Sequence, residues 1–197
     1  MNGYAKIPRP DPCLMELVSR LAREPWTDHP STVHPVLGAA ARAAHDHATP
    51  SARPLLLPLA PRFLDTNTPG LEPSARLVAL CVSTALATTK PSEELLSGDE
   101  RRRLMAARQT ALYLLGDEEG PGGAARWWLP ALSRVGWSER FYRSFVATEQ
   151  VAEAAAVVAR APDSDRRLRQ LLKQCLAVQG AVRPRPSCSA SAQKSWA

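Results

Sequence analysis

Residues 73–87 read PSARLVALCVSTALA, and this stretch decides the fold class. Pro73 opens it, in the first turn of a helix, where the missing backbone N–H leaves no hydrogen bond unmade. Leu77, Leu80 and Cys81 then recur at the spacing of one helical face, and further valine and leucine residues occupy the other faces. A helix that is apolar nearly all round is typical of a protein interior. The stretch therefore predicts a helix at the centre of an all-helical bundle.

Helical signals continue on both sides of this stretch. Asp11 is the expected N-cap of the first helix, Ser97 and Glu100 have the spacing of a capping box, and Gly180 is expected to end the last helix. The alanine-rich stretch 35–48 would let a neighbouring helix approach closely. Six further helices are predicted, over about residues 12–24, 35–48, 98–115, 124–135, 138–160 and 164–179.

The segment 49–68 has a different character, because Pro50, Pro54, Pro58 and Pro61 interrupt an otherwise apolar sequence. Each proline inside a helix removes one backbone hydrogen bond and clashes with the preceding turn. The segment is therefore expected to form short, kinked helical pieces, with an edge strand as the alternative.

These patterns predict an all-α fold, an irregular bundle of about seven helices with a proline-broken segment. A chain of 197 residues fits one ordinary domain and buries about 70% of its unfolded surface. We expect the helical domain to span residues 1–180. Residues 181–197, AVRPRPSCSASAQKSWA, have the composition of a flexible, disordered basic tail.

Charge and cysteine usage narrow the class of protein. Half of the formal net charge of +6 comes from Arg183, Arg185 and Lys194 in the acid-free tail, so the helical domain carries little excess charge. The cysteines form no CxxC pair, and residues 1–12 contain no apolar secretory segment, which predicts reduced thiols and a cytoplasmic location. No apolar run is long enough to predict a membrane span.

The sequence contains no motif that commits it to catalysis. Phosphate-binding glycine loops and the HExxH zinc motif do not occur, and the serine in residues 136–140, GWSER, lacks the second glycine of a nucleophile elbow. His45 and His47 point in different directions on a helix, so they do not predict a metal site. We therefore expect no catalytic residue, no metal and no cofactor.

Aromatic residues are concentrated in one part of the chain. Within twenty residues lie Trp127, Trp128, Trp137, Phe141, Tyr142 and Phe145. Aromatic side chains dominate the binding energy of protein interfaces, although the same cluster could form one end of the core. The main hypothesis is a non-enzymatic helical protein-interaction or regulatory module. Its predicted partner-binding residues are Trp127, Trp128, Trp137 and Tyr142.

Two other functions are compatible with the sequence. Arg166, Arg169 and Lys173 share the outer face of the last helix, and with the basic tail they could bind the phosphates of a nucleic acid. The second alternative is a small enzyme with a pocket between helices, near the aromatic cluster and the proline-broken segment.

Overall fold

The computed structural model describes residues 12–89, 95–116 and 137–182. These residues have an all-α fold, as predicted, and no strand occurs among them. The α-helices are α1 (Leu14–Leu21), α2 (Pro35–His47), α3 (Leu71–Thr89), α4 (Gly98–Leu114), α6 (Trp137–Phe141), α7 (Ala147–Ala159) and α8 (Ser164–Val182). Between α2 and α3 lie two 3-10 helices, η1 (Arg53–Leu55) and η2 (Leu57–Phe63), and a π-helical turn, η4 (Tyr142–Val146), joins α6 to α7.

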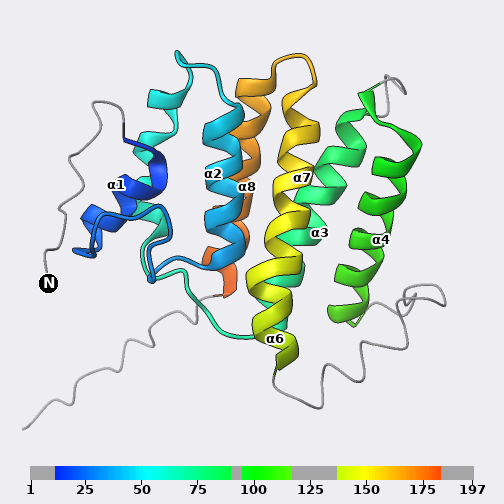
Figure 1. Ribbon diagram of the computed structural model, residues 1–197, viewed down its shortest axis with the longest axis horizontal. Helices are drawn as coiled ribbons and strands as arrows, with labels where there is room; N and C mark the ends of the chain where they lie inside the picture. Colours follow the sequence, from blue (N-terminus) through cyan, green and yellow to red (C-terminus); the bar gives the residue numbers. More distant parts are fainter. Residues whose placement is uncertain (1–11, 90–94, 117–136, 183–197) are drawn as a thin grey trace, which may run out of the picture.

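The long helices run side by side in Figure 1, with α2 and α7 in front of α8 and α3, and with α4 at one edge. Helix α3 packs against α2, α4, α7 and α8, which confirms the central position that its all-round apolar sequence predicts. On the other side of the bundle, α1 packs against α2 and η2. The N-termini of α2 and α3 and the C-terminus of α8 lie at the same end of the bundle as α6.

The interior of the bundle is built from small and branched side chains. Ala40, Ala41 and Ala44 of α2 are fully buried, and α2 packs on α7, where Ala147 and Val151 are also fully buried. Small side chains let the two helix backbones approach closely, as the alanine-rich sequence predicts. Between α3 and α8, the Sγ atoms of Cys81 and Cys175 lie 3.5 Å apart. The contact with Cys175 and the burial raise the pKa of the Cys81 thiol, so the Cys81 sulfur packs as a small neutral group.

The proline-broken segment forms the short helical pieces that its sequence predicts. Pro54 and Pro58 occupy the first turns of η1 and η2, where the amide they lack is not required, and Pro61 lies inside η2. The segment also contributes to the core, because the side chain of Phe63 is fully buried. The alternative of an edge strand was therefore wrong.

The caps of two helices differ from those expected. Helix α1 begins at Leu14 with Cys13 as its N-cap: the Cys13 sulfur accepts a hydrogen bond from the Glu16 amide at 3.4 Å, and the Glu16 carboxylate accepts one from the Cys13 amide at 3.0 Å. The predicted cap, Asp11, lies outside the described residues. At the other end of the chain, α8 continues past Gly180, because this glycine keeps a helical backbone and does not adopt the positive φ that ends α4 at Gly116.

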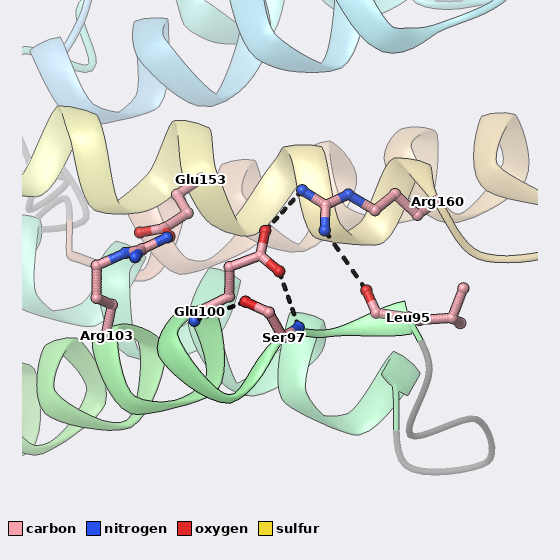
Figure 2. A network of polar contacts seen from close by, with 6 residues as sticks. All are labelled: Leu95, Ser97, Glu100, Arg103, Glu153 and Arg160. Atoms are coloured by element: carbon pink, nitrogen blue, oxygen red, sulfur yellow. Dashed lines mark hydrogen bonds and ion pairs between the residues drawn. The ribbon is translucent and has the colours of Figure 1, made fainter.

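A polar network joins α4 to α7 (Figure 2). The predicted capping box is present, with Glu100 N to Ser97 Oγ at 3.2 Å and Ser97 N to Glu100 Oε2 at 2.9 Å. The other carboxylate oxygen of Glu100 accepts a hydrogen bond at 2.7 Å from Arg160, the C-cap residue of α7, and Arg103 donates one to Glu153 at 2.9 Å. Hydrogen bonds from Arg160 and from Ser97 lower the pKa of Glu100 to about 2. The cap of α4 therefore also attaches this helix to the bundle.

Replacing Ser97 with alanine is expected to lower the free energy of unfolding by about 1 kcal/mol, because the Glu100 amide loses its acceptor. Urea-induced unfolding followed by circular dichroism measures this change. Ser144 is exposed and lies within a helical turn, so Ser144→Ala is the matched control and should change the value by less than about 0.5 kcal/mol. Equal effects of the two substitutions would show that the cap does not stabilise α4.

Candidate interaction surfaces

The chain from Trp137 to Ala159 is one continuous helical run interrupted by the π-helical turn η4. The amide of Ala147 donates to the carbonyl oxygen of Tyr142, five residues earlier, whereas an α-helix would use the residue four earlier. This extra residue changes which side chains face the core. A regular α-helix would extend the buried face of α7, which carries Ala147 and Val151, to Arg143 and Ser144, whereas the inserted residue brings Tyr142 to that face. Phe141 is 43% exposed and Phe145 is 64% exposed.

The two exposed rings form one apolar surface on η4 and the adjoining helices. Their centroids lie 5.5 Å apart with the ring planes tilted by 30°. Beside them, between α2 and α7, is a groove of about 560 Å³. We call the two rings and this groove the phenylalanine surface. The groove is lined by Ala39, Arg42, Ala43, Asp46, His47, Ser144, Phe145, Thr148, Glu149 and Ala152.

Hydrogen bonds hold the π-helical turn to the loop that precedes α3. The carboxylate of Glu139 accepts a hydrogen bond from the Gly70 amide at 2.6 Å and lies 3.9 Å from the Arg143 guanidinium. Arg143 in turn donates to the side-chain oxygen of Asn67. Gly70 has a φ of +106°, which a residue with a side chain rarely adopts. The backbone beneath the phenylalanine surface is therefore fixed by contacts with a distant part of the chain.

Buried polar groups lie at the same end of the bundle. His34 is fully buried, with its Nε2 3.3 Å from the Ser74 hydroxyl, and its Nδ1 has no hydrogen-bond partner among the described residues. Burial and the nearby Arg143 charge lower the pKa of His34 to about 3. Burial also raises the pKa of Tyr142, whose hydroxyl is likewise without a described partner. Both side chains are therefore neutral at physiological pH.

Of the predicted partner-binding residues, the structure places only Tyr142 fully. Its side chain is 3% exposed, so it supports the surface from below and does not lie on it. Trp137 begins α6, but only its backbone is described, and Trp127 and Trp128 lie outside the described residues. The aromatic pair that does lie on the surface, Phe141 and Phe145, belongs to the aromatic cluster seen in the sequence but was not among the predicted partner-binding residues.

The predicted basic residues of the last helix lie together on α8. Arg166, Arg169 and Lys173 line a groove of about 500 Å³ between α8 and the segment that contains η1. We call this the basic groove. Its lining residues are Ala48, Ser51, Ala52, Leu55, Leu56, Asp165, Arg166, Arg169, Gln170 and Lys173. A second groove of about 620 Å³ lies between α8 and α3 and shares Arg166 and Gln170 with the first.

Within the described part of the chain, no three His, Cys, Asp or Glu side chains lie close enough together to hold a metal ion. The ring of His45 is buried and that of His47 is exposed, so the two histidines do not converge. Among the helices of residues 12–89, 95–116 and 137–182, none is both long and apolar enough to cross a membrane.

Comparison of the chain with protein-family models, curated proteins and solved structures finds no match. Function is therefore inferred from the two surfaces themselves.

Proposed function

We propose that this protein is a non-enzymatic helical interaction module that binds a partner protein through the phenylalanine surface. The observation that carries this proposal is the exposed ring pair. Phe145 is the most exposed large apolar side chain among the described residues, and Phe141 lies in contact with it. Covering such rings with a partner removes apolar surface from water, and aromatic side chains are enriched among the residues that dominate binding energy.

The groove beside the rings suits an apolar-faced helix of the partner. Ala39 and Ala43 of α2 and Ala152 of α7 are small, which leaves space for a large side chain between the two helices. Among its lining residues, Arg42 and His47 are basic, whereas Asp46 and Glu149 are acidic. A rim with both signs of charge is typical of the polar border of a protein interface, and it is a poor site for the phosphates of a nucleic acid.

A cytoplasmic location is part of the proposal. It is supported by the use of the cysteines, since Cys13 caps α1 and the sulfurs of Cys81 and Cys175 pack in the core as thiols. Each of these roles requires a reduced cysteine, as in a reducing compartment.

The test compares proteins captured by the wild-type protein and by the double variant Phe141→Ala and Phe145→Ala. Loss of hot-spot side chains that contribute about 2 kcal/mol to the binding free energy weakens binding about thirtyfold. Quantitative mass spectrometry should therefore find much less of the partner captured by the variant than by the wild-type protein. The affinity of the recovered partner for both proteins is then measured by calorimetry, with the same thirtyfold difference expected.

Met105→Ala is the matched control, because Met105 is an exposed apolar side chain on α4, away from the phenylalanine surface. This variant should retain the partner. If the double variant keeps its fold and still binds every protein that the wild type binds, the proposed surface is wrong.

A further inference from the structure

The basic groove has an excess of positive charge that no carboxylate of the described residues neutralises. Among the described residues, Arg166, Arg169 and Lys173 form no ion pair. Some arginines elsewhere in the fold differ in this respect, whereas others, such as Arg62 and Arg140, also form no ion pair with a described residue. Each of the following has a carboxylate partner: Arg76, Arg102, Arg103, Arg143 and Arg160.

The single acid in the basic groove is already engaged. Asp165 accepts hydrogen bonds from the Thr49 amide at 2.9 Å and from the Thr49 hydroxyl at 2.7 Å. It attaches the start of α8 to the end of α2 and does not bridge to the cations. From Arg166 to Lys173 the helix spacing is three and then four residues, so the three cations lie along one face of α8.

The opposite wall of the basic groove is apolar. Leu55 is 52% exposed and Leu56 is buried, and the alanines Ala48 and Ala52 lie beside them. Binding of phosphates alone would not require an exposed leucine on the wall opposite the cations. A ligand that fits both walls of the basic groove has carboxylates on the side that meets the cations and a large apolar side chain on the side that meets Leu55.

We infer that the basic groove binds an acidic amphipathic segment of a partner protein. Its carboxylates contact Arg166, Arg169 and Lys173, and an apolar side chain packs on Leu55. This inference goes beyond the proposed function, because it shares no residue with the phenylalanine surface and specifies the chemistry of the ligand.

The experiment selects ligands from random 16-residue peptides displayed on phage, with the full-length protein as the target. The enriched peptides should combine several Asp or Glu residues with a Leu, Phe or Trp at helical spacing. One enriched peptide, labelled with fluorescein, is then titrated in fluorescence polarisation. Its Kd should rise about tenfold in the double variant Arg169→Gln and Lys173→Gln, and also in Leu55→Ser. Raising the salt concentration should weaken binding to the wild-type protein.

The control removes the same charge elsewhere, in the double variant Arg62→Gln and Arg140→Gln, whose residues are exposed and do not line the basic groove. It should leave the Kd within about twofold of the wild-type value. Circular dichroism and the thermal midpoint establish that each variant is folded. Because Leu55, Arg169 and Lys173 are at least partly exposed, a loss of binding can be separated from a loss of fold.

Any one of four results would overturn the inference. The first is no enrichment of acidic peptides, and the second is binding of the enriched peptide that neither groove variant weakens. In the third, a 20-nucleotide single-stranded DNA binds more tightly than the peptide. The double variant Arg169→Gln and Lys173→Gln then abolishes DNA binding, whereas Leu55→Ser leaves DNA binding unchanged. That result would make the groove a nucleic-acid surface. Loss of peptide binding in Phe141→Ala and Phe145→Ala would instead move the ligand to the phenylalanine surface.

Discussion

Replacing Phe63 with alanine is expected to lower the free energy of unfolding by about 3–5 kcal/mol. The ring is fully buried at the end of η2, which packs against α1 and α8. Its removal loses the free energy of burying the ring and leaves a cavity, and the prolines of η2 restrict how far the backbone can move to fill it. Urea-induced unfolding, followed by circular dichroism at two protein concentrations, measures the change.

The same substitution at Phe145 provides the control, because that ring is largely exposed. Phe145→Ala should change the free energy of unfolding by less than about 0.5 kcal/mol, although it is predicted to weaken partner binding. If Phe63→Ala also changes stability by less than 1 kcal/mol, the proline-broken segment does not contribute to the core in the way described.

The parts of the fold that follow from the sequence are those in which local spacing and burial agree. In α3 the apolar residues surround the helix, and in α2 small residues cover the contact face, so periodicity alone indicates their positions. The Ser97 and Glu100 capping box was also predictable, since its two hydrogen bonds lie within four consecutive residues. The short helical pieces of the proline-broken segment follow from the geometry of proline.

The candidate surfaces depend on contacts that local spacing does not encode. The π-helical turn brings Tyr142 to the buried face, where a regular helix would not place it, and the turn is held by Glu139 and Arg143 through residues of the distant loop before α3. The cationic face of α8 could be predicted from spacing. Its apolar counterpart at Leu55 could not, because more than a hundred residues separate the two walls.

Acid is expected to destabilise the protein through His34. The pKa of this histidine is about 3 in the folded protein, against an ordinary value of 6.5. Between these values the unfolded chain binds a proton that the folded protein does not, so the stabilisation is complete above pH 6.5 and is lost as the pH falls toward 3. At 1.36 kcal/mol per pKa unit, the free energy of unfolding should decrease by about 3 kcal/mol between pH 7 and pH 4 from this group.

The carboxylates also make stability depend on pH, and they do so equally in the wild-type protein and in the variant His34→Gln. Comparing the two proteins therefore isolates the contribution of His34. The free energy of unfolding of His34→Gln should depend less steeply on pH between 7 and 4, whereas the exposed control His29→Gln should keep the wild-type slope.

Nuclear magnetic resonance gives a second measurement that does not depend on the stability of the variant. The ring signals of His34 should stay at their neutral-form positions in the folded protein down to pH 4. A charged imidazole would have to remain in the core beside Arg143, and among the described residues the ring has no hydrogen-bond partner except the Ser74 hydroxyl. Titration of these signals near pH 6.5 without unfolding would mean that water or a counterion reaches the ring, and the predicted acid sensitivity would then be absent.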